Sequence, residues 1–192
     1  MTGPPGDDPA PAPPVTGAPV VVAPMRRRHL RAVLRIEAQQ EHEGWSLGLF
    51  LSEIGRRHDR TYLVARQAGQ VRGYLGLLYA LEDAHVTTLA VDEGHRRRQL
   101  ATRLLLVGAR RALVHGARNL TLEVRASNEA AIAVYRRFGF APVGVRPGYY
   151  GDVGEDALVM WATDIDGPAY AERLDGSEAG LPTATRTEEL GA

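Results

Sequence analysis

The sequence predicts an α/β or α+β domain in which helices flank a sheet. Between residues 20 and 165, segments with apolar residues at helical spacing alternate with short β-branched runs. The two ends of the chain differ from this middle part. Residues 1–19 are acidic and rich in Pro and Gly, and residues 166–192 are acidic with no sustained apolar period. We therefore expect a disordered tail over 1–19, one domain over 20–165 and a flexible tail over 166–192.

The first half of this domain contains two amphipathic segments and several strand-like runs. The expected elements are a first strand at 20–23, helices at 28–40 and 46–57, and strands at 62–66, 71–81 and 85–91. In the second helix, Leu47, Phe50 and Ile54 recur three and four positions apart, which places them on one face. The segment Gln67-Ala-Gly-Gln70 between two apolar runs is typical of a hairpin turn.

The second half continues the alternation and has clear end signals. The expected elements are a helix from Leu100 to Val114, a strand at 119–125, a helix starting after Ser127 or Asn128, and a strand at 157–162. Residues 119–125 alternate strictly between apolar and polar side chains, as a strand between two environments does. Gly116 and Gly139 follow the two helices, where a residue in the left-handed conformation commonly ends a helix.

Composition excludes several classes of chemistry. The chain has no Cys, which rules out disulfides, thiolate metal sites and a cysteine nucleophile. All 23 basic residues are Arg, so a lysine nucleophile is excluded as well. No apolar run approaches the roughly 18 residues that a membrane span needs, and the N-terminus lacks the basic and apolar regions of a secretion signal. We expect a cytoplasmic protein.

A strand, a basic loop and the start of a helix stand together at residues 88–105. The loop carries Arg96, Arg97 and Arg98 directly before the helix. Free backbone N–H groups at the start of a helix, the positive end of its dipole and three guanidinium groups would bind a phosphate or pyrophosphate. Taken alone, the three arginines fit a solvated surface run equally well.

A second set of motifs follows further along the chain. It consists of Leu122-Glu-Val-Arg-Ala-Ser-Asn128, Ala131-x-x-x-Tyr135-x-x-x-Gly139-Phe140, Arg146-x-x-Tyr149-Tyr150 and Glu155-Asp-Ala157. Together with the basic loop, these motifs resemble the GNAT acetyltransferases. Within that superfamily they look like the RimI type, bacterial enzymes that acetylate the N-terminal alanine of a small-subunit ribosomal protein. The resemblance covers about residues 20–163 of the chain.

The resemblance implies a GNAT fold, a mixed and mostly antiparallel sheet flanked by helices. Its two central parallel strands splay apart, and these correspond to residues 85–91 and 119–125. It also implies acetyl-CoA as co-substrate and no metal. The pantetheine arm would lie between the splayed strands, with the pyrophosphate on the loop before the helix. By resemblance, the cofactor contacts are Leu89, Ala90, Val91, Arg96, Arg97, Arg98, Gln99, Leu100, Ala101, Thr102, Asn128 and Tyr135.

One position departs from the family pattern. Gln99 stands where the family's loop usually has its first glycine, whereas Ala101 is an allowed small residue at the second position. Glycine permits a positive φ and lets the backbone approach the phosphates closely. Gln99 keeps its N–H, and with a negative φ its side chain can point away from the ligand. The substitution therefore bears on cofactor affinity and not on the fold.

Two residues are expected to carry the chemistry, because acetyl transfer to an amine needs the amine neutral and the departing thiolate protonated. By resemblance, Glu123 is the general base and Tyr135 the general acid. Glu123 faces away from Leu122 and Val124 and lies near the end of its strand. The alternatives are that Glu123 is a carboxylate paired with Arg125, and that Tyr135 is a core aromatic whose hydroxyl reaches the rim.

Aromatic residues would form the substrate groove. Trp45, in the loop between the first two helices, and Tyr149 and Tyr150 correspond to the walls of the family's peptide groove. Packing on the core explains Trp45 equally well. The six histidines show no spacing that is typical of a metal site, so we interpret all of them as structural or solvated.

Three functions stay open at this point. The first is an N-α-acetyltransferase acting on a protein N-terminus, preferably the alanine of a ribosomal protein, with no nucleic-acid or membrane partner. The second is a GNAT enzyme that acts on a small-molecule amine. The third is an acetyl-CoA-binding module without catalysis, which Gln99 favours and the pair Glu123 and Tyr135 opposes. Residues 25–165 hold 21 Arg against 15 acidic side chains, a positive balance that suits a polyanionic cofactor.

Overall fold

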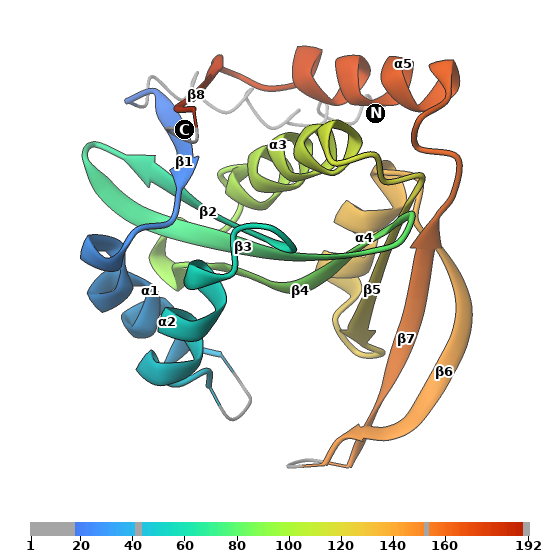
Figure 1. The fold of residues 1–192 in the computed structure, drawn as a ribbon, viewed down its shortest axis with the longest axis horizontal. Helices are drawn as coiled ribbons and strands as arrows, with labels where there is room; N and C mark the ends of the chain where they lie inside the picture. Colours follow the sequence, from blue (N-terminus) through green and yellow to red (C-terminus); the bar gives the residue numbers. More distant parts are fainter. Residues whose placement is uncertain (1–17, 41–43, 152–153, 190–192) are drawn as a thin grey trace, which may run out of the picture.

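The structure is a computed structural model that describes residues 18–40, 44–151 and 154–189. Within these ranges, eight strands form one sheet in the order β6-β7-β5-β4-β3-β2-β1-β8 (Figure 1). The strands are β1 (Val20–Pro24), β2 (Arg60–Gln67), β3 (Gln70–Ala80), β4 (Asp83–Val91), β5 (Asn119–Arg125), β6 (Ala141–Tyr150), β7 (Glu155–Ala162) and β8 (Thr185–Thr187). Neighbours run antiparallel except for the parallel pairs β4–β5 and β1–β8. The predicted mixed, mostly antiparallel sheet is confirmed.

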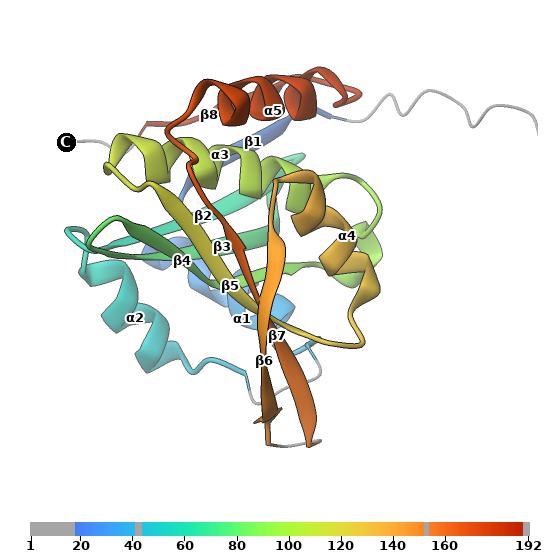
Figure 2. The same ribbon diagram turned by 90° about the vertical axis from the view of Figure 1, so that its right-hand side faces the viewer.

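Helices cover both faces of this sheet. They are α1 (Leu30–Glu37), α2 (Leu47–Gly55), α3 (Leu100–Val114), α4 (Glu129–Arg137) and α5 (Pro168–Ala179), with short 3-10 helices η1 (Arg27–His29) and η2 (Glu93–His95). α1 and α2 pack on one face, while α3 packs on the other and α4 lies near it (Figures 1 and 2). Each face has its own cluster of buried apolar residues. In the described ranges, no helix is long and apolar enough to cross a membrane.

Most of these elements lie where the residue pattern predicts them. β5 has the predicted bounds, residues 119–125. Its three apolar side chains all belong to the core cluster that includes α3, as the strict alternation predicts. Gly116 and Gly139 follow α3 and α4 with φ of +83° and +81°. Asn128 caps α4 by accepting the N–H of Ala131 at 3.1 Å. The predicted tail over 1–19 falls largely on residues 1–17, which lie outside the described residues.

The two central parallel strands separate part of the way along their length. β4 and β5 are paired from their first residues to Val86 opposite Leu122, and the pairing ends there. Beyond this point β4 continues to pair with β3, whereas Glu123 of β5 pairs with Val159 of β7. Figure 1 shows the two strands diverging toward their ends. The predicted splay is confirmed, and Glu123 lies where it begins.

The predicted flexible tail over 166–192 is wrong for the part that the structure describes, residues 166–189. α5 lies over α3, and β8 pairs in parallel with β1 at the edge of the sheet (Figures 1 and 2). Tyr170 and Leu174, one helical turn apart, are 5% and 3% exposed and belong to the same core cluster as α3. These two side chains give α5 an apolar stripe that packs against the core cluster around α3.

Two arginines of α3 also hold the C-terminal segment. Arg110 donates to Oε2 of Glu178 at 2.7 Å, on the side of α5 that faces α3. Arg103 is only 1% exposed and donates to the hydroxyls of Thr183 at 2.9 Å and Thr185 at 2.6 Å. A guanidinium that is buried in this way needs hydrogen-bond acceptors, and the segment around β8 supplies them.

A Leu174→Ala variant is expected to lose about 2–4 kcal/mol of unfolding free energy, because it removes a buried anchor and leaves a cavity under α5. Urea unfolding measures this change. Ala179→Ser, at an exposed position of the same helix, is the control and should change stability by less than about 0.5 kcal/mol. A loss for Leu174→Ala no larger than that of the control would show that α5 does not dock on α3.

Candidate active site

The carboxylate of Glu123 lies at the point where β4 and β5 separate. Glu123 is the first residue of β5 beyond the last pair with β4. Because side chains alternate along a strand, it points away from Leu122 and Val124, which face the core cluster around α3. Its side chain is 11% exposed. A charged group is therefore held, largely shielded from water, beside the opening between the strands.

This carboxylate has two basic neighbours. Its Oε2 lies 3.1 Å from Nε2 of His85 on β4, and its Oε1 lies 3.0 Å from Nη2 of Arg146 on β6. Arg125 forms an ion pair with Glu155, at 3.0 Å. The ion pairs of the described residues thus join Glu123 to His85 and Arg146, and not to Arg125 as the alternative interpretation has it.

His85 reaches Glu123 because it stands opposite Thr121 in the pairing of β4 and β5, two residues before the carboxylate. Nδ1 of His85 lies 2.8 Å from the hydroxyl oxygen of Thr121. Burial lowers the pKa of His85; Glu123 opposes this shift and Arg146 adds to it. At pH 7 the imidazole is therefore neutral. Both contacts are satisfied when Nε2–H donates to Glu123 and the Thr121 hydroxyl donates to Nδ1.

Tyr135 approaches the same region from the other face of the sheet. It lies on α4, belongs to the core cluster around α3 and is 7% exposed. Its ring packs against Phe140 with the ring centres 5.7 Å apart. Burial, with a smaller contribution from Tyr150, raises the pKa of Tyr135 well above its ordinary value. The phenol therefore keeps its proton through the neutral range and can act as a proton donor.

A small hollow of about 90 Å³ opens beside Tyr135, between the end of β4, the first turn of α3 and α4. Its lining is mostly apolar and consists of Leu89, Val91, Ala101, Ala131, Val134 and Tyr135. Four of these residues were predicted as cofactor contacts, and the structure brings those four together. Ala90 and Leu100, also predicted, are 6% and 1% exposed and belong to the core clusters, and they do not line this hollow.

The loop between β4 and α3 is fixed at its start by Asp92. The Asp92 carboxylate accepts from Arg72 at 3.1 Å and from the N–H of Gly94 at 3.3 Å. The three predicted arginines, 96–98, follow with exposed side chains, and the first of them pairs with Glu93 at 3.3 Å. The loop therefore has an ordered base and a positively charged rim.

The first turn of α3 has no side-chain cap. Gln99 occupies the cap position, but its side chain accepts no hydrogen bond from the helix. By contrast, Ser46 and Asn128 cap α2 and α4. The N–H groups at the start of α3, which include those of Ala101 and Thr102, are thus left for an anion, and the helix dipole favours negative charge at this end.

Gln99 adopts a left-handed backbone conformation with φ +58°. The backbone at Gln99 therefore turns as it would with glycine. A negative φ, which would let the side chain point away from the ligand, is not observed. Arg97, two residues earlier, has φ +63°. The side-chain Oε1 of Gln99 is buried and has no hydrogen-bond partner among the described residues. A non-glycine residue in this conformation costs roughly 1–2 kcal/mol.

A Gln99→Gly variant is accordingly expected to gain about 0.5–1 kcal/mol of unfolding free energy. Glycine removes the strain of the left-handed conformation and the buried side-chain oxygen that has no partner. These gains outweigh the extra conformational entropy that glycine gives to the unfolded chain. Urea unfolding measures the change. Gln70→Gly is the matched control, since Gln70 lies in a strand and outside the left-handed region, and this variant should be destabilised. A Gln99→Gly protein less stable than the parent would contradict the expected strain.

Trp45, a predicted groove residue, packs on the core. Its ring centre lies 5.3 Å from that of Phe50 and 6.2 Å from that of Tyr62. Its backbone N–H donates to Oε1 of the buried Glu37 at 2.9 Å. The residue as a whole is half-buried. The packing role is thus observed, and the groove role stays a prediction.

Tyr149 and Tyr150, the other predicted groove residues, lie on β6 near the tip of the β6–β7 hairpin. The guanidinium of Arg125 lies 4.1 Å from the ring centre of Tyr150, and that of Arg146 lies 5.6 Å from the ring centre of Tyr149. Because Arg146 also contacts Glu123, Tyr149 is linked to the carboxylate through one residue. The hairpin and α2 extend toward the same end of the molecule (Figures 1 and 2).

His85 and Arg146 are the candidates that sequence reasoning missed as partners of Glu123. The interpretation of all histidines as structural or solvated does not describe His85, which contacts the predicted base. The sequence does hold a signal for the contact between His85 and Glu123. If the strands at 85–91 and 119–125 are placed as parallel neighbours, the polar face of the first lies beside Thr121 and Glu123 of the second. Among the described residues, no group of three or more His, Cys, Asp or Glu is placed to hold a metal ion.

Comparisons with known proteins agree with this arrangement. The family model described as "Acetyltransferase (GNAT) family" matches residues 27–140. A Bacillus subtilis protein provisionally named as a ribosomal protein bS18-alanine N-acetyltransferase is 36% identical over 139 residues, 72% of this chain and 92% of that protein. The Escherichia coli K12 protein named ribosomal protein bS18-alanine N-acetyltransferase is 33% identical over 141 residues, 72% and 94% of the two chains. The crystal structure of the E. coli ribosomal-protein-S18-alanine N-acetyltransferase superposes with a TM-score of 0.69 at 31% identity, and the match covers 76% of this chain and 94% of that one.

Proposed function

Because the chain belongs to the GNAT family of acetyltransferases, we propose that it transfers the acetyl group of acetyl-CoA to the N-terminal amine of a protein. The names of its bacterial relatives make the N-terminal alanine of ribosomal protein bS18 the first candidate substrate. A cytoplasmic location, where such a substrate is made, goes with this proposal.

The observation that carries the proposal is the placement of Glu123 at the start of the splay. The separation of β4 and β5 begins at this residue, and Tyr135 lies on the opposite face, in the core cluster beside the strand. A thioester that enters along the α3 and α4 face and an amine that arrives from the Glu123 face can meet only where the sheet is open between them. That opening is at Glu123.

The residues present fit acetyl-CoA, which would supply an acetyl group activated as a thioester. The hollow lined by Leu89, Val91 and Ala101 offers an apolar path for the pantetheine arm. The uncapped start of α3 offers backbone N–H groups to the pyrophosphate, with Arg97 and Arg98 exposed beside it. Since the chain has no Lys, the phosphate contacts would come from arginine and backbone.

Glu123 would accept a proton from the ammonium of the substrate, directly or through one water. Its two oxygens are oriented by His85 and Arg146, which fixes the carboxylate at the opening. A protein N-terminus has a pKa of about 7.7–8.0, so at neutral pH only a minor fraction is in the reactive neutral form. A carboxylate in this position removes that proton where the amine is bound.

Tyr135 would donate its phenolic proton to the thiolate that leaves. The hydroxyl is protonated at neutral pH because burial raises its pKa, and the residue lines the hollow in which the pantetheine arm would end. Asn128 would hold α4 in position through its cap and offer its amide to the cofactor. Trp45, Tyr149 and Tyr150 would form the sides of the acceptor groove.

The test is an acetylation assay with acetyl-CoA and peptides that begin with Ala-Arg, Ser or Met, in which release of free thiol is followed. We expect the Ala-Arg peptide to be the preferred substrate. Preference for a polyamine or another small amine over every peptide would overturn the substrate assignment. Binding of acetyl-CoA with no turnover on any amine would overturn the enzymatic assignment for this chain.

A further inference from the structure

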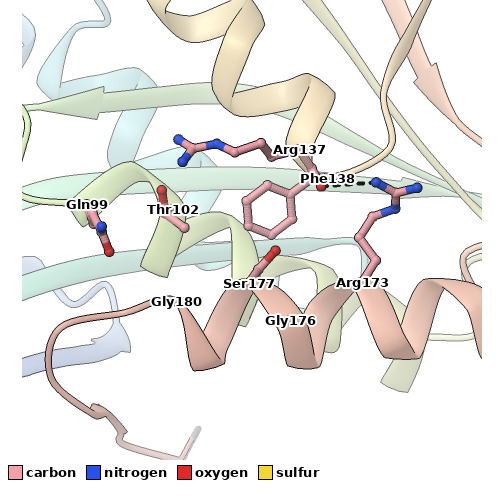
Figure 3. Close-up of a pocket in the computed structure, with 8 residues that line it drawn as sticks. All are labelled: Gln99, Thr102, Arg137, Phe138, Arg173, Gly176, Ser177 and Gly180. Atoms are coloured by element: carbon pink, nitrogen blue, oxygen red, sulfur yellow. Dashed lines mark hydrogen bonds between the residues drawn. The ribbon is translucent and has the colours of Figure 1, made fainter.

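A second and larger hollow, of about 380 Å³, lies between α3, α4 and α5 (Figure 3). Its size is in the range of small-molecule sites, roughly 300–1,000 Å³. Gln99 and Thr102 come from the start of α3, Arg137 and Phe138 from the end of α4, and Arg173 and Ser177 from α5. α5 lies outside residues 27–140, the part that the family model matches. One wall of this hollow is therefore built by a segment beyond the family match.

The hollow adjoins the place where the pyrophosphate of acetyl-CoA would lie. Gln99 and Thr102, which line it, belong to the uncapped first turn of α3. Ala101, in the same turn, lines the small hollow proposed for the pantetheine arm. The start of α3 thus separates the two hollows. Since a pyrophosphate joins pantetheine to 3′-phosphorylated adenosine in coenzyme A, the larger hollow lies on the nucleotide side.

The lining carries positive charge. Arg137 and Arg173 extend into the region from α4 and α5 (Figure 3), and neither forms an ion pair with a carboxylate of the described residues. The two residues are joined by a hydrogen bond from the Arg173 guanidinium to the backbone carbonyl of Arg137, at 3.3 Å. The hydroxyl of Ser177 points from α5 toward the ring of Phe138 in the same view. Two guanidinium groups and a hydroxyl are donors suited to a phosphate.

Two of the three acidic residues of α5 are paired with α3. Asp175 and Glu178 both pair with Arg110 of α3, at 3.4 Å and 2.7 Å. Arg173 and Ser177 are four residues apart and therefore share one side of the helix, which is the side that lines the hollow. The pairing with Arg110 fixes α5 against α3, and this turns the basic side of α5 toward the start of α3.

From this arrangement we propose that α5 completes the cofactor site, with Arg173 and Ser177 binding the 3′-phosphate of the coenzyme A ribose together with Arg137. This inference rests on the proposed use of acetyl-CoA. The C-terminal segment, for which the sequence predicts a flexible tail, would then distinguish coenzyme A from cofactors that lack the 3′-phosphate. The contacts are charge-assisted and partly open to solvent, so the preference is moderate and sensitive to salt.

The test is calorimetric titration of the full chain with coenzyme A and with 3′-dephospho-coenzyme A. We expect the parent protein to bind coenzyme A about 5- to 20-fold more tightly than the dephospho form. Arg173→Ala should remove most of this preference by weakening coenzyme A alone. Ser177→Asp, which places a negative charge in the hollow without touching the Arg173 hydrogen bond, should do the same. Arg186→Ala, an exposed arginine on β8, is the matched control and should keep the full preference.

The possible outcomes separate the two proposals. If neither form of coenzyme A binds, the proposed function itself is wrong. If both bind but the preference is absent from the parent, or survives in both Arg173→Ala and Ser177→Asp, the role of α5 is overturned and the proposed function stands. A thermal destabilisation of Arg173→Ala with the preference intact would likewise overturn it, because Arg173 would then only hold the end of α4.

Discussion

A Glu123→Gln variant is expected to lose about 10²–10⁴-fold in kcat at pH 7 while it keeps its fold and its affinity for acetyl-CoA. Glutamine has the size of glutamate, and its carbonyl oxygen can still accept from Arg146. What it lacks is a site for the proton of the substrate ammonium. The rate with an N-terminal peptide, measured under saturating acetyl-CoA, tests this expectation directly.

The pH dependence separates a base from a merely structural carboxylate. The α-amine of the peptide loses its proton in solution with a pKa of about 7.7–8.0. Raising the pH from 7 to 9 should therefore recover part of the activity of Glu123→Gln, since the amine then arrives neutral. A loss that stays constant over this range would point to misplacement of His85 and Arg146 instead. Full activity of Glu123→Gln at pH 7 would remove the assignment of Glu123 as the base.

His85 provides the matched comparison. Its neutral imidazole orients one oxygen of Glu123 but cannot replace the carboxylate as a proton acceptor at the opening. If Glu123 is the base, a His85→Gln variant should retain much more activity than Glu123→Gln. Equal losses in the two variants would indicate that the cluster acts only as a structural unit.

The central part of the fold could be predicted from local patterns because each element carries its own signal. β5 alternates strictly, and its apolar face is buried. α4 has a cap at Asn128 and a glycine stop at Gly139. These signals depend on residues a few positions apart. The predicted splay of the two parallel strands at 85–91 and 119–125 rests instead on the resemblance to a family, and its start at Glu123 is visible only in the structure.

Two segments escaped prediction for different physical reasons. β6 contains Pro142, Gly144, Pro147 and Gly148, which argue against a strand, but it is the edge strand of the sheet, where Pro is tolerated, and its pairing with β7 has two register shifts. α5 has few apolar residues and a glycine in its interior, so its stability comes from docking on α3 and not from its own sequence. Edge position and tertiary docking are not visible in a local pattern.

The contacts of the site were harder to predict than its residues. Glu123 and Tyr135 were chosen by motif, but the partners of Glu123 come from β4 and β6, which are distant in sequence. The backbone of Gln99 shows the same limit. Its positive φ follows from the geometry of the loop and overrides the preference of the side chain, so the residue type alone does not give the sign of φ.

A Tyr135→Phe variant is expected to lose about 10²–10⁴-fold in kcat, because the departing thiolate then lacks its proton donor. Phenylalanine keeps the packing against Phe140, so stability should change little. Burial raises the pKa of Tyr135, so the phenol stays protonated and the defect should be present across the whole range from pH 7 to 9. This constancy contrasts with the partial recovery expected for Glu123→Gln.

The control for this variant is Tyr170→Phe. Tyr170 is also buried, 5% exposed, and its hydroxyl has no hydrogen-bond partner among the described residues, but it lies on α5 and lines neither hollow. Loss of its hydroxyl should leave kcat unchanged. A Tyr135→Phe enzyme as active as Tyr170→Phe would mean that the thiolate takes its proton from water or from the amine. In that case the role of Tyr135 would be confined to closing the apolar hollow beside the cofactor.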